Sequence, residues 1–121
     1  MKTAPNVWAI AAPMLEKALA YQKEHSIEDV ADAIDRGDAQ LWCGDKSVLV
    51  TEMLKYPRRK VCRIWLASGE KDELVYRMLP DVEAWAAEKG CAAVEVVGRK
   101  GWLRLLDGYT QPATVLSKEI G

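Results

Sequence analysis

Residues 39–67, AQLWCGDKSVLVTEMLKYPRRKVCRIWLA, decide the fold of this chain. They contain three β-rich runs, Ala39–Cys43, Ser47–Leu54 and Lys60–Ala67. The turn signals Gly44-Asp45-Lys46 and Tyr56-Pro57-Arg58-Arg59 separate the runs, and no helical pattern stands between them. Because consecutive strands joined by short turns pair antiparallel, the stretch predicts a three-stranded antiparallel meander.

The chain after the meander predicts a long helix and then a further strand. Apolar residues recur at three- and four-residue spacing from Glu70 to Lys89, and Gly90 predicts the end of that helix. Pro80 either kinks the helix or splits it in two. The apolar run Cys91–Val97 then predicts a buried strand. A helix that connects two strands of one sheet is typical of a parallel crossover, so this strand should lie parallel to its neighbour.

The remaining segments predict flanking elements on either side of this unit. Ser26 and Asp29 have the spacing of a capping box, and Gly37 predicts the end of the helix that they begin. We expect, in chain order, a strand at Val7–Ile10, helices at Pro13–Lys23 and Ser26–Gly37, a short helix around Trp102–Leu106, a small strand near Tyr109 and a strand at Ala113–Ile120. The fold class is therefore α/β (α+β), with a mixed central sheet, an antiparallel meander, a crossover helix and flanking helices.

Composition limits the classes of function. A chain of 121 residues that is 50% hydrophobic and 29% charged is expected to form one domain over residues 1–121. No apolar run approaches the ~20 residues of a membrane span, and no secretory signal pattern opens the chain, so we expect a cytoplasmic protein. A net charge of −1 favours no nucleic-acid partner, and the basic groups at Arg58-Arg59-Lys60-Arg63 and Arg99-Lys100-Arg104 are interpreted as solvated surface. One histidine and three separated cysteines predict no metal site.

Short motifs throughout the chain carry a family resemblance. They are Gly37-Asp38-Ala39-Gln40-Leu41-Trp42, Val50-Thr51-Glu52, Trp85-Ala86-x-x-x-Gly90-Cys91, Gly98-Arg99-x-Gly101-Trp102 and Leu116-x-Lys118. With the order of elements, they resemble the GNAT superfamily of acetyl-CoA-dependent N-acyltransferases, in particular GNAT-like proteins encoded in bacteriophage and prophage genomes. The resemblance covers residues 8–120.

The resemblance implies an acetyl-CoA site between the strands 60–67 and 91–97. Backbone groups near Ile64, Trp65 and Leu66 would hold the pantetheine arm and polarise the thioester carbonyl. The pyrophosphate loop of the family corresponds to residues 67–73, where Ser68, Gly69 and Lys71 are the candidate ligands. This segment carries three carboxylates, which either repel a pyrophosphate or simply stabilise the helix N-terminus. Arg99 and Lys100 are alternative phosphate ligands.

The resemblance also directs attention to proton transfer. Glu52 and Glu95 are candidate general bases toward an amine, although a strand glutamate is more commonly a solvent-facing residue. The family's general-acid tyrosine corresponds to Leu106, which cannot transfer a proton. Tyr109, three residues further on, is the remaining candidate for the acid.

Two functions stay open from the sequence. One is an active N-acyltransferase that moves an acetyl group from acetyl-CoA to an amine acceptor. The other is a catalytically inactive GNAT-like protein that is associated with a virion or binds a phage or host protein. An open cleft between the two central strands favours the first, and a cleft filled by Trp65 or Arg99 favours the second.

Overall fold

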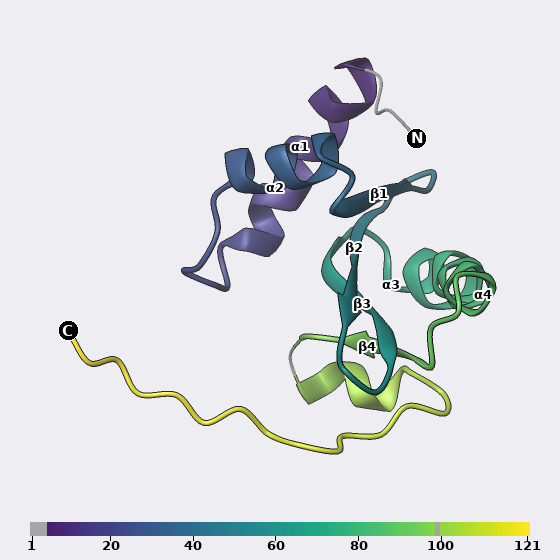
Figure 1. The fold of residues 1–121 in the computed structure, drawn as a ribbon. Coiled ribbons are helices and arrows are strands. Elements are labelled where there is room, and N and C mark those ends of the chain that lie inside the picture. Colours follow the sequence, from purple (N-terminus) through teal and green to yellow (C-terminus); the bar gives the residue numbers. More distant parts are fainter. Residues whose placement is uncertain (1–4, 99) are drawn as a thin grey trace.

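A mixed four-stranded sheet forms the centre of the molecule (Figure 1). The computed structural model describes residues 5–98 and 100–121. The strands lie in the order β1 (Ala39–Cys43), β2 (Val48–Lys55), β3 (Lys60–Ser68) and β4 (Ala93–Val96). The first three pair antiparallel and β4 pairs parallel with β3, which confirms the predicted meander and crossover.

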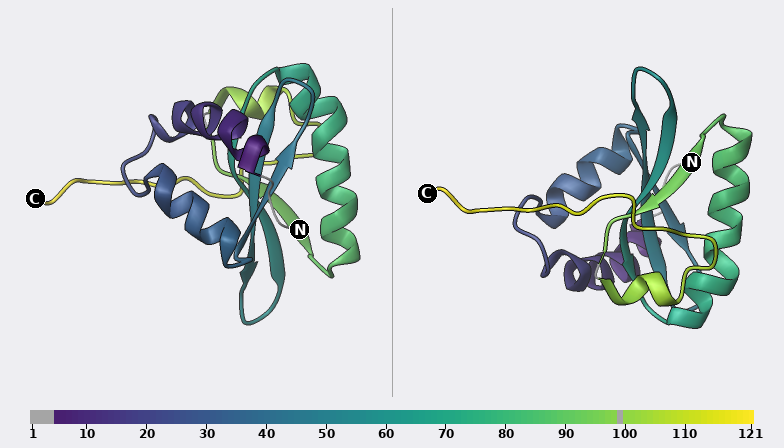
Figure 2. Two further views of the ribbon diagram at one scale, coloured as in Figure 1. Left: turned by 90° about the horizontal axis from the view of Figure 1, so that it is seen from above. Right: turned by 90° about the horizontal axis from the view of Figure 1, so that it is seen from below.

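Helices cover both faces of this sheet (Figure 2). Helices α1 (Pro5–Leu19) and α2 (Ile27–Asp35) lie on one face, where Leu15 and Val30 pack against Val50. The helical segment made of α3 (Lys71–Glu73), η1 (Leu74–Met78) and α4 (Leu79–Glu88) lies on the other, where Val82 packs with Leu49. The neighbouring residues Leu49 and Val50 of β2 thus pack into the cores on opposite faces of the sheet, because successive side chains of a strand point to opposite faces.

The crossover helix passes Pro80 without splitting. The backbone N–H of Leu79 donates to the carbonyl of Leu74, five residues earlier, as in a π-helical turn. This wider turn immediately precedes Pro80, whose missing N–H would interrupt a regular α-helical ladder. The segment from Lys71 to Glu88 therefore stays helical throughout.

The capping box predicted for α2 is confirmed. The N–H of Asp29 donates to the Ser26 hydroxyl at 3.3 Å, and the Asp29 carboxylate accepts from the Ser26 N–H at 2.8 Å. Hydrogen bonding of the Asp29 carboxylate by the Ser26 N–H, and then by the Ser26 hydroxyl, lowers the pKa of Asp29. After the helix, Gly37 adopts a φ of 82°, which suits a glycine that ends a helix.

The prediction of a strand at Val7–Ile10 is wrong, because α1 already begins at Pro5. Ala11, Leu15 and Leu19 are buried at four-residue spacing, and Trp8 continues this stripe toward the N-terminus. Pro13 therefore lies inside the helix rather than in its first turn. Both Pro13 and Ala9, whose carbonyl loses its N–H partner, are exposed, so water can satisfy that carbonyl.

The predictions of strands at Ala113–Ile120 and near Tyr109 are also wrong for this structure. Residues 110–121 form an extended, exposed segment, and Tyr109 lies in a turn that follows the short helix η2 (Lys100–Arg104). An extended segment becomes a strand only when its backbone groups pair with another strand. No described strand lies beside this one.

Candidate functional site

The strands β3 and β4 diverge halfway along the sheet. They pair from Val61 opposite Ala93 to Ile64 opposite Val96, after which the Val97 N–H still reaches the Ile64 carbonyl at 3.4 Å. Strand β3 continues to Ser68, whereas β4 ends at Val96. The last part of β3 therefore has no partner on its β4 side within the described residues.

A β-bulge lies at the point of divergence. Val50 of β2 is opposite Leu66, but the next residue, Thr51, is opposite Ile64, so Trp65 is an extra residue on β3. In a regular strand Ile64 and Leu66 would point to the same face of the sheet. Because of the bulge they point to opposite faces: Ile64 belongs to the core beneath α4, whereas Leu66 belongs to the core beneath α1. A bulge bends the strand that carries it, and here it accompanies the separation of the two strands.

A cavity of about 370 Å³ opens in this gap. Side chains from both helical layers line it, including Tyr21 in the turn after α1, Leu74 and Leu79 of the crossover helix, and Trp102 and Leu106 around η2. Strand β4 contributes Val96, and Val97 and Gly98 follow it in the wall. Its lining is mainly apolar, which suits a ligand with an extended, weakly polar arm.

The structure brings six of the predicted cofactor residues together around this cavity. They are Ile64, Trp65, Leu66, Ser68, Gly69 and Lys71. The Trp65 ring packs with the first core and meets the His25 ring edge to face, with a centroid distance of 4.8 Å. Trp65 therefore forms part of the wall and leaves the cleft open. Arg99 lies outside the described residues, and Lys100 is described only as the first residue of η2.

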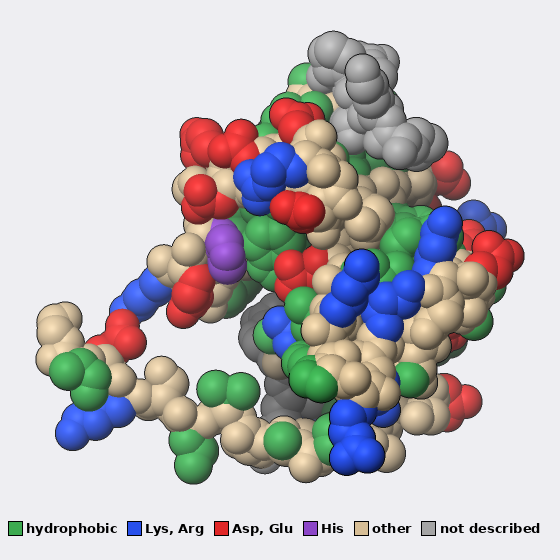
Figure 3. All heavy atoms as spheres, in the orientation of Figure 1, with side chains coloured by type: hydrophobic (Ala, Val, Ile, Leu, Met, Phe, Trp, Pro, Cys, Tyr) green, Lys and Arg blue, Asp and Glu red, His purple; other side chains and the backbone are tan. Residues whose placement is uncertain are grey.

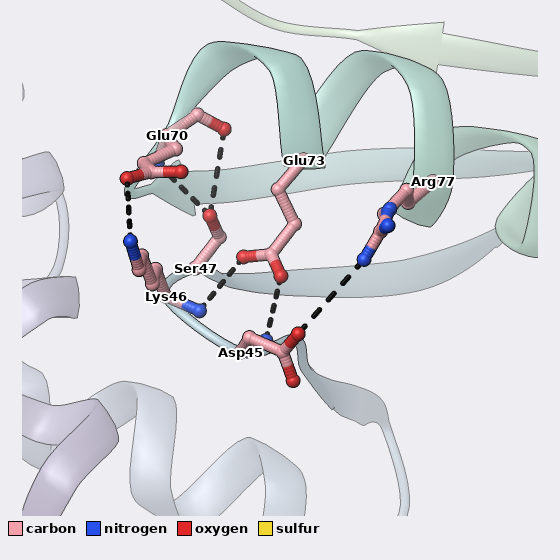
Figure 4. Close-up of polar contacts among 6 residues, drawn as sticks. All are labelled: Asp45, Lys46, Ser47, Glu70, Glu73 and Arg77. Atoms are coloured by element: carbon pink, nitrogen blue, oxygen red, sulfur yellow. Dashed lines mark hydrogen bonds and ion pairs between the residues drawn. The ribbon is translucent and has the colours of Figure 1, made fainter.

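The start of the crossover helix is bound to the β1–β2 hairpin (Figure 4). The Glu70 N–H donates to the Ser47 hydroxyl oxygen at 2.9 Å, and that hydroxyl lies 3.4 Å from the Glu70 carbonyl. Gly69 adopts a φ of 131°, and a Cβ there would overlap both the side chain and the backbone of Ser47. Ser47 thus occupies one of the N–H groups that a helix N-terminus otherwise offers to an anion.

The carboxylates of this segment contact the hairpin (Figure 4). Glu73 accepts hydrogen bonds from the N–H groups of Asp45 at 2.6 Å and Lys46 at 2.9 Å. Hydrogen bonding from the Ser47 hydroxyl, then from these N–H groups, lowers the pKa of Glu73, with a smaller contribution from the charge of Arg77. Glu70, the N-cap residue, makes no side-chain capping bond and instead forms an ion pair with Lys46 at 3.5 Å. The two carboxylates therefore hold the hairpin rather than cap their own helix.

Two lysines line the cavity. Lys71 stands at the first position of α3, and Lys17 comes from α1 on the opposite side of the sheet. Both side chains are exposed, and neither forms an ion pair with another described residue. They are the described cations available to an anionic ligand at this cleft.

The candidate bases lie in one row across three strands. Glu52 of β2 is opposite Arg63 of β3, which is opposite Glu95 of β4. The Arg63 guanidinium donates two hydrogen bonds to Glu95 at 3.2 Å and lies 3.7 Å from a Glu52 oxygen. The three half-buried side chains share the sheet face that carries α1 and α2, and neither carboxylate belongs to the cavity lining.

The candidate acid Tyr109 lies away from the cavity lining. Its hydroxyl donates to a carboxylate oxygen of Glu83 on α4 at 2.8 Å. Burial, together with the hydrogen bond and the charge of Glu83, raises the pKa of Tyr109 well above its ordinary value. Leu106, which the resemblance matches to the family's acid, is 8% exposed and faces the cavity. The roles of Glu52, Glu95 and Tyr109 stay predictions.

The basic residues at the β2–β3 hairpin separate into two environments. Arg58 and Arg59 are exposed at its tip. Figure 3 shows several Lys and Arg side chains close together on the face that it draws. Arg63 instead forms ion pairs with Glu52 and Glu95.

Among residues 5–98 and 100–121, no three His, Cys, Asp or Glu side chains gather as a metal site. No helix in that part has the length and apolar character needed to cross a membrane.

No sequence pattern singles out Ser47, Glu73, Lys17 or Tyr21 as parts of the site. Ser47 and Glu73 act through contacts that join positions 23 to 28 residues apart, and no local pattern reports such contacts. Lys17 and Tyr21 are four residues apart on the predicted helix, so this spacing was the available signal that they share a face.

No family model and no curated protein matches the sequence. Solved structures do match the fold. A GNAT family acetyltransferase from Staphylococcus aureus aligns with a TM-score of 0.66 at 13% identity, over 98% of this chain and 95% of that one. A transcriptional regulator from Bacillus halodurans gives 0.68 at 12%, over 99% and 97%. An aminoglycoside antibiotic 6'-N-acetyltransferase from Acinetobacter haemolyticus gives 0.59 at 12%, over 98% and 97%. At such identities the likeness shows the fold, and it confirms the predicted GNAT-like architecture.

Proposed function

We propose that the protein is an N-acyltransferase that moves an acetyl group from acetyl-CoA to an amine acceptor. The observation that carries the proposal is the divergence of β3 and β4 at the Trp65 bulge. It leaves a mainly apolar cavity of about 370 Å³ lined by six residues that the resemblance assigns to the cofactor. The GNAT fold of the chain is consistent with this chemistry.

Acetyl-CoA would supply an activated acetyl thioester. The unpaired side of β3 beyond Ile64 offers backbone groups to an extended pantetheine arm, much as a sheet edge accepts an added strand. A backbone N–H aimed at the thioester carbonyl would stabilise the negative charge that develops there. The amine nitrogen then bonds to the carbonyl carbon as the carbon–sulfur bond breaks.

The phosphates would meet an unusual site. Ser47 occupies the Glu70 N–H, so Lys71 and Lys17 at the cleft, with Arg99 and Lys100 further along the chain, are the proposed cationic ligands. The carboxylates that would oppose a phosphate are partly neutralised, because Glu70 pairs with Lys46 and Glu73 binds the hairpin turn.

The proton of the amine would pass to Glu95 or Glu52, whose carboxylates Arg63 holds in place on the face of α1 and α2. The leaving thiolate needs a proton in turn. Leu106 cannot give one, and Tyr109 gives one only after its bond to Glu83 opens. Water is therefore the proposed proton source at the cavity.

Calorimetric titration with acetyl-CoA tests the proposal. We expect a micromolar dissociation constant, equivalent to about −8 kcal/mol. Lys71→Ala, Arg99→Ala and Lys100→Ala should each weaken binding severalfold, whereas Lys89→Ala, an exposed lysine beyond α4, should leave it unchanged. The absence of binding up to millimolar ligand, with an unchanged melting temperature, would contradict the proposal.

A second function is supported by different observations. The occupied N–H of Glu70 and the leucine at position 106 both favour an inactive GNAT-like protein that binds a virion, phage or host protein. Under this alternative the titration with acetyl-CoA gives no heat. The experiment that then tests the protein's function is the capture of a binding partner from the virion, the phage or the host. The phage or prophage origin rests on the sequence resemblance, and the genes adjoining this one in its genome test it.

A further inference from the structure

The β2–β3 hairpin extends beyond the rest of the sheet as a two-stranded ribbon. Strand β1 pairs with β2 only as far as Glu52, and β4 begins to pair with β3 at Val61. The Ala92 N–H makes one bond more, to the Lys60 carbonyl at 2.8 Å. No described strand lies on either side of residues 53–60, and Figure 2 shows this hairpin projecting past the helices.

The ribbon carries four positive charges and no negative charge. The four residues are Lys55, Arg58, Arg59 and Lys60. The sequence has no Asp or Glu between Glu52 and Glu70. None of the four cations forms an ion pair with another described residue. Their charges are therefore not neutralised within the part of the chain that the structure describes.

Two of these cations face each other across the ribbon. Lys55 of β2 is opposite Lys60 of β3. Like charges that are directly opposite destabilise a strand pair. Further into the sheet the same two strands place Glu52 opposite Arg63, which is the favourable combination. The pair of lysines costs stability that no described carboxylate offsets, which points to an anionic ligand outside the chain.

The cations lie on both faces of the ribbon and at its tip. Met53 belongs to the core beneath α4, so strand alternation puts Lys55 and the opposite residue Lys60 on that side. Arg59, whose carbonyl still accepts an N–H across the ribbon at 2.9 Å, precedes Lys60 and therefore points to the other side. Arg58 lies in the turn between the strands. A ligand that meets all four cations therefore has negative charge on both sides of the ribbon.

We propose that the β2–β3 hairpin binds double-stranded DNA by entering the major groove. That groove is about 12 Å wide and admits a two-stranded β-ribbon. Phosphates border the groove on both sides, so they meet cations on both faces of the hairpin. A single strand offers phosphates to one face only, and the major groove of duplex RNA is too narrow. Contacts to phosphates carry no base preference, so the binding is expected to be largely independent of sequence.

The net charge of −1 does not oppose this local contact. Exposed charges further apart than the Debye length, about 8 Å at physiological salt, are largely screened from one another. The hairpin also lies at the opposite end of β3 from the cavity, whose β3 lining begins at Ile64. DNA binding is therefore expected to be independent of acetyl-CoA.

Fluorescence anisotropy with a short labelled DNA duplex, without acetyl-CoA, tests the proposal. We expect a micromolar dissociation constant at about 50 mM salt. Four neutralised phosphates give a slope of about −3.6 for the logarithm of affinity against that of salt, and thus about 100-fold weaker binding at about 200 mM. Lys55→Ala and Arg58→Ala should each weaken binding and make the slope shallower by about 0.9. Lys23→Ala removes an exposed cation from the loop between α1 and α2 and should change neither.

The same assay gives the outcomes that overturn the proposal. One is the absence of binding at low salt. Another is an equal effect of Lys23→Ala and the hairpin variants, because the contact then lies elsewhere or is unspecific. Equal affinity for single-stranded DNA or duplex RNA of the same length removes the major groove from the explanation. Displacement of the duplex by poly-glutamate at equal charge concentration indicates an acidic protein partner instead.

Circular dichroism confirms that each variant is folded, and calorimetry with acetyl-CoA separates this proposal from the proposed function. The hairpin variants should bind acetyl-CoA as the parent chain does, because the hairpin and the cavity lie at opposite ends of β3. A failure of DNA binding leaves the acetyl-CoA titration unchanged, and the reverse holds too.

Discussion

The carboxylate of Glu73 binds the backbone N–H of Lys46 at 2.9 Å, across 27 residues of sequence (Figure 4). With the bond to the Asp45 N–H, this contact fixes the β1–β2 hairpin against the start of the crossover helix. The same helix start forms the phosphate end of the proposed site. The hairpin and the site are therefore expected to respond together to changes at Glu73.

Neutralisation of Glu73 should lower stability in a pH-dependent way. Because the pKa of Glu73 is lower in the folded chain than its ordinary value of about 4.3, its stabilising effect is present above that value. The effect is lost as pH falls through the folded pKa. We expect Glu73→Gln to unfold at a lower temperature than the parent chain at neutral pH and to approach it in acid. Glu88→Gln, at an exposed carboxylate, is the control. Equal melting curves for Glu73→Gln and the parent at neutral pH would contradict the prediction.

Gly69→Ala should destabilise the chain by about 1–3 kcal/mol. The φ of 131° is unfavourable for alanine, and the added Cβ would overlap Ser47. The matched control is Gly101→Ala, whose Cβ would meet no heavy atom within 4 Å. Urea unfolding measures both variants. If the two lose the same stability, the close packing of the loop on Ser47 is not the cause.

Thr51 carries a buried polar contact that should be sensitive to substitution. Its hydroxyl accepts from the Trp42 indole N–H at 3.0 Å and donates to the Gln40 side-chain oxygen at 2.7 Å, and the residue is fully buried. Thr51→Val removes both bonds and should cost about 1–3 kcal/mol. Thr51→Ser keeps the hydroxyl and should cost less, which denaturant unfolding followed by tryptophan fluorescence can measure. A larger loss in the serine variant would show that the methyl group, and not the hydroxyl, matters at this position.

Leu106→Tyr should raise acetyl transfer if the proposed function holds. The leucine faces the cavity at the position that the sequence resemblance assigns to the family's general acid, and a positioned acid contributes typically about 10²–10⁴-fold in rate. Leu106→Phe adds a ring of similar size without the hydroxyl and controls for repacking. We expect the tyrosine variant to exceed the phenylalanine variant by at least about tenfold in thiol release from acetyl-CoA with an amine. Equal rates in the two variants would remove position 106 from the proton-transfer step.

The local patterns of the sequence predicted most of the sheet. Strand β1 begins and ends where the sequence placed it, β2 begins and ends one residue later than predicted, and β3 ends one residue later, because turn residues and apolar runs are local signals. Two predicted strands failed for opposite reasons. Val7–Ile10 continues the buried stripe of α1, and Ala113–Ile120 has no partner in the described chain. The first run became part of a helix because its side chains pack with those of the rest of α1. The second run did not become a strand because no described strand pairs with it.

For the candidate site, the resemblance placed the strands, the loop and the six residues that now line the cavity. It did not predict that Ser47 occupies the Glu70 N–H, that Glu73 binds the hairpin, or that Tyr109 binds Glu83. Each of these bonds joins residues more than 20 positions apart.

The sequence by itself determined the order of elements, the meander, the cap of α2 and the parallel crossover. These features follow from turn chemistry, periodicity and capping, which act within a few residues. The tertiary structure decided how far β3 and β4 stay paired, where the bulge lies and which partner each carboxylate binds. Those depend on distances between segments that meet only when the sheet and its two helical layers are assembled, and no local pattern encodes such distances.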